Sequence, residues 1–289
     1  MQIFLRIAVF ALLAGQGVAS WAQDDALLMR GKYLMEGVVA CANCHIARDD
    51  KGHPLFSKGL SGGMLFDDTA FKAYAPNITP DPQTGIGNWT DVQLARAIRE
   101  GIRPDGTLIG PPMPVPFYRN LSDADLAAII AYLRAQPVIK NSVPKSTYFI
   151  PLPANYGPPV GHVELPAMTN TLKYGEYLAN IGHCMDCHTP RNNKGMLVTA
   201  RLGAGGQLIK WPAGGEAVTP NLTPDESGLK SWSDAQIAHA IRDGVDKDGV
   251  HLKRIMAFDW YRNINDSDMN ALIAYLRSLK PEPFLYRGK

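Results

Sequence analysis

Two runs of the form C-x-x-C-H contain the residues best suited to chemistry. They supply the side chains Cys41, Cys44, His45, Cys184, Cys187 and His188. Two thiols at this spacing can each form a thioether to a vinyl group of one haem, and the adjacent imidazole then ligates the iron. The pattern predicts two covalently attached haem c groups, with four cysteines binding the porphyrins and two histidines binding iron.

Two other kinds of site use similar residues, and both fit this chain less well. A redox-active C-x-x-C pair has no need of a following histidine in both runs. A zinc site could use two cysteines and a histidine, but each run would need a fourth ligand at metal-binding spacing. The sequence holds four cysteines in all, so none is left for a disulfide or a thiolate nucleophile.

The distance between the two runs recurs along most of the chain. Cys41 and Cys184 are 143 residues apart, and the same step relates many other positions. Among them are Trp89 and Trp232, Gly101 and Gly244, and the runs Tyr118-Arg119-Asn120 and Tyr261-Arg262-Asn263. A tandem duplication explains this repeat, and each copy should form one haem-binding unit.

The second axial ligand of each iron should also occur at equivalent places in both copies. Met113 and Met256 are 143 residues apart, and each lies 68 residues after its haem histidine. Methionine is usually core filler, but the other methionines lack such a pairing. His53 opposite Met196 is another pair of potential ligands, although each lies only eight residues past a haem histidine. We therefore expect His45, Met113, His188 and Met256 to bind iron.

The hydrophobic periodicity and the capping residues predict the same helices in both copies. Helices should run from about Ala26 and Leu172 into the two haem motifs. Shorter helices should begin after Thr90 and Ser233 and stop at a glycine, and the last helices should open at Ser122 and Asn265. The Gly-, Pro- and Asp-rich segments between them show no sustained period and are predicted to be loops. The predicted fold class is all-α, with two tandem haem-binding domains joined by a Pro-rich linker.

The ends and the middle of the chain differ in composition from the two copies. Residues 1–22 combine Arg6, a short apolar run and small residues before Gln23, which predicts a cleaved signal peptide. The predicted domains are 23–136 and 171–289, joined by a Pro-rich linker at 137–170. Seven prolines exclude helix there. Its aromatic residues suggest packing on a domain surface, although a passive linker fits the sequence as well.

The bulk composition is that of a folded globular protein. Hydrophobic residues make up 46% of the chain and charged residues 19%. The formal net charge of +2 argues against a nucleic-acid partner.

With these motifs together, the chain resembles the cytochrome c subunits of bacterial alcohol, aldehyde and gluconate dehydrogenases. The resemblance covers about Gly31 to Leu279 and rests on both C-x-x-C-H runs, on Pro-Asn-[Ile/Leu]-Thr-Pro-Asp, and on the methionine before Tyr-Arg-Asn. It implies class I cytochrome c folds, His/Met haems and electron passage from a dehydrogenase to a quinone or an oxidase. The well-known members carry a third haem and a C-terminal membrane helix. This sequence has neither, so we expect a soluble carrier or a dissociable subunit.

These inferences lead to one expected function. The protein should be a periplasmic electron carrier without catalytic residues, free or peripheral to the inner membrane; the sequence leaves membrane association open. Its donor would be a periplasmic dehydrogenase for a small organic substrate. Its acceptor would be a terminal oxidase, a quinone or another cytochrome of the respiratory chain. The alternative is a dihaem enzyme such as a peroxidase, which requires an iron with an open coordination position.

Overall fold

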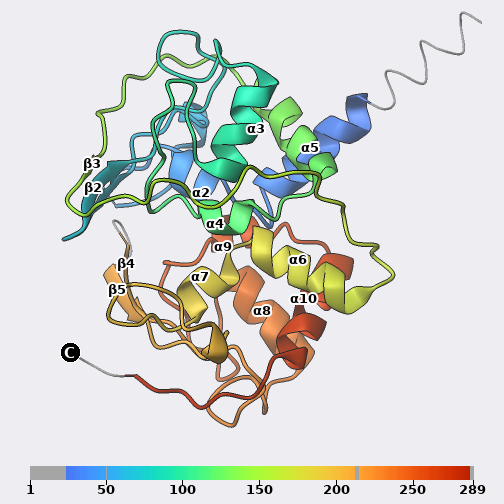
Figure 1. Ribbon diagram of the computed structural model, residues 1–289. Coiled ribbons are helices and arrows are strands. Elements are labelled where there is room, and N and C mark those ends of the chain that lie inside the picture. Colours follow the sequence, from blue (N-terminus) through green and yellow to red (C-terminus); the bar gives the residue numbers. More distant parts are fainter. Residues whose placement is uncertain (1–23, 50, 212–214, 287–289) are drawn as a thin grey trace, which may run out of the picture.

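The computed structural model describes residues 24–49, 51–211 and 215–286. The predicted signal peptide, 1–22, lies outside the described residues. Figure 1 shows two groups of helices arranged one above the other, which we call the first unit (24–136) and the second unit (171–286). The domain boundaries given above stay a prediction.

The first unit contains a helix at 24–35 and four further α-helices. These are α2 (Ala42–His45), α3 (Asp91–Glu100), α4 (Val115–Tyr118) and α5 (Asp123–Arg134), with a 3-10 turn η1 (Phe56–Lys58). The second unit repeats this order with α6 (Thr171–Ile181), α7 (Cys184–His188), η2 (Thr199–Arg201), α8 (Asp234–Asp243), α9 (Phe258–Tyr261) and α10 (Asp266–Ser278).

The helix ends follow the predicted capping residues. Thr90 forms a capping box with Gln93 at the start of α3, and Ser233 does the same with Gln236 at the start of α8. At the other end of α3, Gly101 takes the left-handed conformation with φ 68°. Ser122 and Asn265 cap α5 and α10 as expected.

In each unit the first and last helices cross at a glycine. A Cβ atom on Gly31 would lie 2.0 Å from the carbonyl oxygen of Ala128 in α5, and one on Gly175 would lie 1.9 Å from that of Ala271 in α10. Only glycine allows the backbones to approach so closely. This contact fixes the helix pair against which each haem motif is held.

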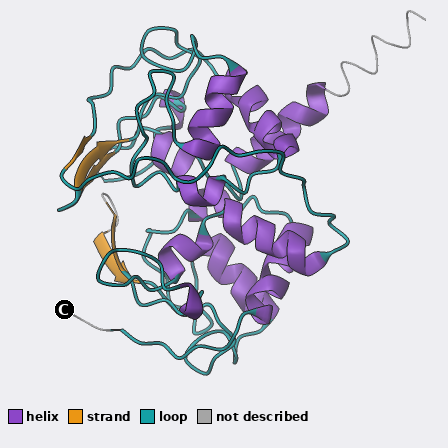
Figure 2. Cartoon of the chain, viewed as in Figure 1, coloured by secondary structure: helices purple, strands orange, loops and turns teal. Residues whose placement is uncertain are grey.

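The prediction of an all-α fold is wrong. After each haem motif the chain forms a short antiparallel pair, β1 (Leu65–Asp67) with β2 (Phe71–Tyr74), and β4 (Leu208–Trp211) with β5 (Gly215–Val218). Both hairpins lie on the same side of the molecule (Figure 2). Strands of three or four residues are too short to show a clear alternation among glycines and aspartates, so the sequence pattern resembled a loop.

The linker packs on the first unit. Its strand β3 (Thr147–Tyr148) pairs with β2, and the Tyr156 hydroxyl donates to the carbonyl of Ile109 at 2.8 Å. The Asn77 and Thr79 side chains both donate to the carbonyl of Ile139. Of the two interpretations of this segment, packing on a domain surface is therefore the one observed.

One hydrophobic core extends through both units, and two equivalent hydrogen bonds cross between them. The Tyr33 hydroxyl donates to Asp268 at 2.7 Å, and the Tyr177 hydroxyl donates to Asp125, also at 2.7 Å. Each tyrosine lies on the first helix of one unit and each aspartate on the last helix of the other. Both carboxylates are buried, so these bonds satisfy groups that would be costly to leave unpaired.

Within the described part of the chain, no helix is both long enough and apolar enough to cross a membrane.

Candidate functional site

Each haem motif forms a short helix that follows a sharp turn. Ala40 and His183 precede α2 and α7 with φ of 49° and 45°, a conformation that L residues rarely adopt. The two residues occupy equivalent places in the repeat. The turn separates each motif from the helix before it and directs the cysteines and the histidine into the unit.

The two histidines are buried in the same way. Nδ1 of His45 lies 2.9 Å from the carbonyl oxygen of Pro76, and Nδ1 of His188 lies 2.9 Å from that of Pro220. Because a carbonyl can only accept, Nδ1 carries the proton and Nε2 keeps its lone pair for a metal. Burial lowers the pKa of both imidazoles, which opposes the effect of the carbonyl bond and keeps them neutral.

The cysteines are not in an environment that activates thiolates. Burial raises the pKa of the Cys41, Cys44 and Cys187 thiols to about 12 and that of Cys184 to about 11. Redox-active cysteines need the opposite shift. The structure therefore disfavours a redox C-x-x-C pair in either unit.

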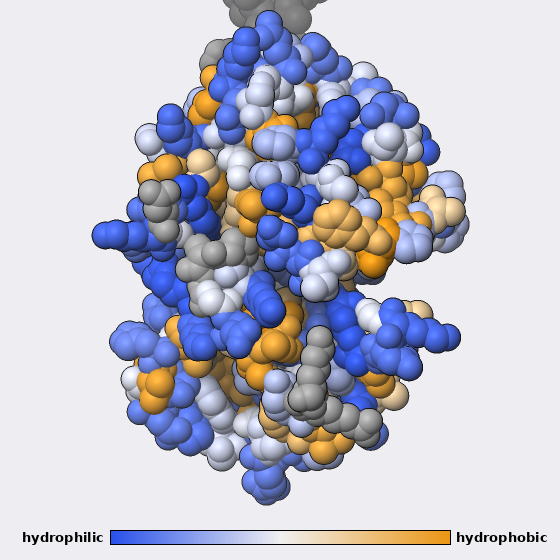
Figure 3. Space-filling view, turned by 90° about the vertical axis from the view of Figure 1, so that its left-hand side faces the viewer, coloured by the Kyte–Doolittle hydropathy of each residue, from blue (hydrophilic) through white to orange (hydrophobic). Residues whose placement is uncertain are grey.

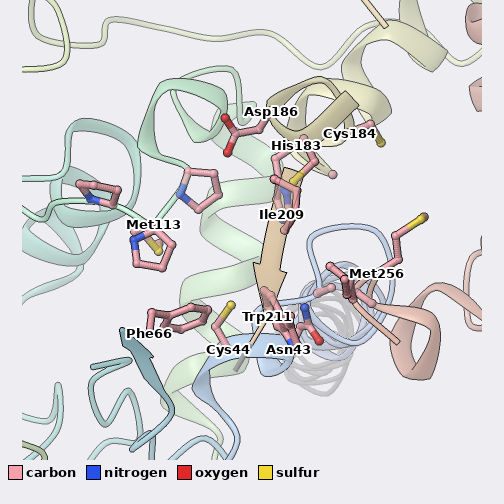
Figure 4. A pocket seen from close by; sticks show the side chains of 18 of the residues that line it. Asn43, Cys44, Phe66, Met113, His183, Cys184, Asp186, Ile209, Trp211 and Met256 are labelled. Atoms are coloured by element: carbon pink, nitrogen blue, oxygen red, sulfur yellow. The ribbon is translucent and has the colours of Figure 1, made fainter. Parts of the chain in front are cut away.

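All eight predicted site residues line one continuous cavity of about 1890 Å³. This volume exceeds the range of about 300–1,000 Å³ for a pocket that holds one small ligand. In Figure 4, Asn43, Cys44 and Met113 from the first unit and Cys184, Asp186 and Met256 from the second lie around the same space. The walls are largely apolar, and the cysteines, oriented histidines and methionines are the donor set that two haem c groups require. The residues present fit the cofactor.

The proposed methionine ligands differ in burial and position from His53 and Met196, the other pair of potential ligands. Met113 and Met256 are half-buried and pack against the hydrophobic core. His53 and Met196 are exposed and lie outside the cavity that contains the haem motifs. The structure thus brings Met113 and Met256 to the site and not the alternative pair, while iron ligation itself stays a prediction.

Several residues of the site were not singled out from the sequence for this role. The buried Tyr118 and Tyr261 line the cavity, and their hydroxyls reach the carbonyls of Val39 and Gly182 at 3.4 and 3.3 Å. Both tyrosines begin the repeated run Tyr-Arg-Asn, and this repetition was the only sign in the sequence that they belong to the site. The Pro76 and Pro220 carbonyls belong to the repeated Pro-Asn-[Ile/Leu]-Thr-Pro-Asp run, which marked them only as part of the repeat.

The face that carries the hairpins is uneven. Figure 3 shows apolar patches among polar side chains there, and an indentation between the upper and lower parts of the molecule. Ile150 and Leu208 are among the exposed apolar residues, and Ile150 also lines the cavity.

Two duplicated helical units, each presenting a C-x-x-C-H motif and an oriented histidine to an apolar cavity, define a protein that binds two haems covalently. The chain belongs to the cytochrome c family, whose model matches residues 28–137 and 172–280. It carries two covalently bound haem c groups, as predicted from the motifs.

Characterised relatives share most of this chain. The cytochrome c subunit of a quinone-dependent alcohol dehydrogenase from Gluconobacter oxydans is 33% identical over 96% of this chain and 60% of its own length. One of the subunits of a nicotinate dehydrogenase from Pseudomonas putida is 31% identical over 96% of this chain and 23% of its own length. A dihaem cytochrome c-type protein from Cereibacter sphaeroides is 32% identical over 82% of this chain and 81% of its own length.

The chain spans less than two thirds of the length of the alcohol and nicotinate dehydrogenase subunits. The predicted resemblance to dehydrogenase cytochrome subunits is confirmed by these matches, and the cytochrome subunits of a fructose and a gluconate dehydrogenase are also similar.

Proposed function

We propose that this protein carries electrons from a partner dehydrogenase toward the respiratory chain and performs no substrate chemistry itself. The observation that carries the proposal is the equivalence of the two sites. Each presents an oriented histidine and a methionine to the same apolar cavity. An iron held by both a histidine and a methionine would have no position left for a substrate, which suits electron transfer.

The donor is proposed from the relatives. Cytochrome subunits of alcohol, fructose and gluconate dehydrogenases and a subunit of a nicotinate dehydrogenase are similar to this chain, so the donor would oxidise a small organic molecule. The acceptor would be a terminal oxidase, a quinone or another cytochrome. We place the carrier in the periplasm, exported by the segment 1–22, because that segment has the composition of a cleaved signal.

The proposal is tested by mixing the oxidised holoprotein with dehydrogenases of these classes and their substrates. We expect one of the enzymes to reduce both haems within seconds, and substrate alone to reduce them slowly. The absorbance of reduced haem c measures both rates. If no dehydrogenase reduces the protein faster than its substrate does alone, a dehydrogenase is not the donor.

A second measurement separates the carrier from an enzyme such as a peroxidase. If both irons hold a histidine and a methionine, carbon monoxide should barely change the spectrum of the reduced protein at neutral pH. Stoichiometric binding of carbon monoxide to either haem would reveal an open iron and contradict the carrier proposal.

A further inference from the structure

The two haem motifs differ in charge at one equivalent position. Asn43 and Asp186 each precede the second cysteine of their motif, and both line the cavity. The duplication preserves the surrounding helices, loops and predicted ligands, so at this position the two sites differ by a single carboxylate next to a haem.

In the second unit the carboxylate is part of an ion pair. Arg191 donates from Nη2 to the side chain of Asp186 and from Nη1 to the carbonyl of Gly195 at 2.8 Å. The positive charge next to the second haem motif is therefore balanced by a negative one.

In the first unit the equivalent arginine bonds to an amide side chain instead of a carboxylate. Arg48 donates from Nη2 to Oδ1 of Asn43 at 3.1 Å and to its carbonyl at 3.0 Å, and from Nη1 to the carbonyl of Gly52 at 2.7 Å. The arginine keeps the position of its counterpart Arg191, but Asn43 provides no negative charge to balance it. Asp259 of the second unit lines the same small pocket as Arg48, and this carboxylate is itself paired with Arg254.

The guanidinium of Arg48 is also partly removed from water. Its centre lies 5.6 Å from the centroid of the Trp260 ring, which belongs to α9 of the second unit and is buried. Within the described residues, its Nε is buried and has no hydrogen-bond partner. A charge in such a position acts more strongly on its neighbours than one in solvent, because water screens it less.

A second pair of equivalent residues also makes the first site more positive than the second. Arg103 in the first unit corresponds to Asp246 in the second, and both are half-buried residues that line the cavity. Other charged residues on the cavity wall, such as Asp68 and Lys253, are exposed. Solvent and salt screen these exposed charges, so the partly buried pairs should dominate.

We propose that the two haem sites are unequal, the first having the higher reduction potential, so that electrons pass within the chain from the second site to the first. A positive charge nearby disfavours the ferric state, which carries one more positive charge than the ferrous state, and so raises the potential. A balancing carboxylate removes this effect at the second site.

The two sites adjoin each other, which would allow electrons to pass directly between them. They share one cavity, and α2 of the first motif packs against α9 of the second unit. In the transfer one electron leaves the second site, which is oxidised, and reaches the first, which is reduced; no bond or proton changes.

The order of transfer rests on the proposed carrier function, but its test does not need a partner. The holoprotein is titrated against a reference electrode while the haem spectrum is recorded. We expect two one-electron steps, and a tenfold preference for one site separates them by about 59 mV.

Reciprocal substitutions show which step of the titration belongs to which haem site. Asp186→Asn gives the second site the residue of the first and should raise the lower potential alone. Asn43→Asp does the reverse and should lower the higher potential alone. Each change should narrow the separation. Glu226→Gln changes an exposed residue that is paired with Lys230 and does not line the cavity. It is the matched control and should leave both potentials unchanged.

Two results would overturn the proposal. If Asp186→Asn moves the higher step, the order of the sites is the reverse of the one proposed. If neither substitution moves a step although both variants bind two haems, the charge at this position does not set the difference. Failure of every dehydrogenase to reduce the protein would instead disprove the proposed donor and leave the titration unaffected.

Discussion

At the scale of single residues, the backbone carbonyls behind the two histidines define what each imidazole can do. By accepting from Nδ1, the Pro76 and Pro220 carbonyls leave Nε2 free to bind iron. The methionines need no comparable orientation, because a thioether sulfur is a soft ligand without a proton to place.

The methionine ligands can be tested singly. Met113→Ala and Met256→Ala should each remove about half of the near-infrared band that arises from methionine bound to ferric haem. Met196→Ala, which truncates an exposed methionine, is the control and should leave the band unchanged. A variant at Met113 or Met256 that retains the full band would show that another residue ligates that iron.

At the scale of elements, the first and last helices hold each motif in place and also join the units. The Asp125 and Asp268 side chains lie in the first turns of α5 and α10, where a negative charge is favoured by the helix dipole. Each then receives a tyrosine hydroxyl from the other unit. The first turn of the last helix in each unit is therefore hydrogen-bonded to a tyrosine of the other unit.

Removing one of these tyrosine hydroxyls should destabilise the whole chain. Tyr33→Phe and Tyr177→Phe should each lower the free energy of unfolding by about 1–3 kcal/mol, because a buried carboxylate loses a hydrogen bond. Urea unfolding followed by circular dichroism measures the change. Tyr132→Phe removes a hydroxyl that bonds to Glu36 within the first unit at a more exposed position, and should cost about 1 kcal/mol or less. Equal effects of all three changes would argue against a special role for the bonds between units.

At the scale of the whole molecule, the linker and the shared core make the two copies depend on each other. Residues Ile139, Thr147 and Tyr148 bond to the first unit, and residues further on bond to α3 and α5. Contacts of the linker with the first unit thus continue as far as Val163, while the domain boundary at residue 136 stays a prediction.

Fragments of the chain test this dependence. A first-unit fragment that ends at residue 165 should resist urea better than one that ends at 138, because the shorter fragment removes β3 from β2 and the Ile139 carbonyl from Asn77. Both should be exported with the native N-terminal segment and compared through their haem c spectra. Equal stability would show that the linker packs on the unit without contributing to it.

Much of the architecture follows from local sequence. The ends of α3, α5, α8 and α10 are set by hydroxyl, amide and glycine residues next to apolar runs, and such signals act over one helical turn. The strands escaped prediction because, among the described residues, the first hairpin buries only Phe66 and Ala73 and the second buries no side chain, which is too little to leave a pattern.

The chemistry and the spatial arrangement are determined at different levels. The covalent haem motif is local, since five consecutive residues supply both thioethers and a ligand, and the duplication indicated the methionines. Only the tertiary structure decided that both motifs line one cavity, that Arg48 meets Trp260 of the other unit, and that tyrosines cross between units. These contacts join residues that are distant in sequence, and which of them form depends on how the two units pack.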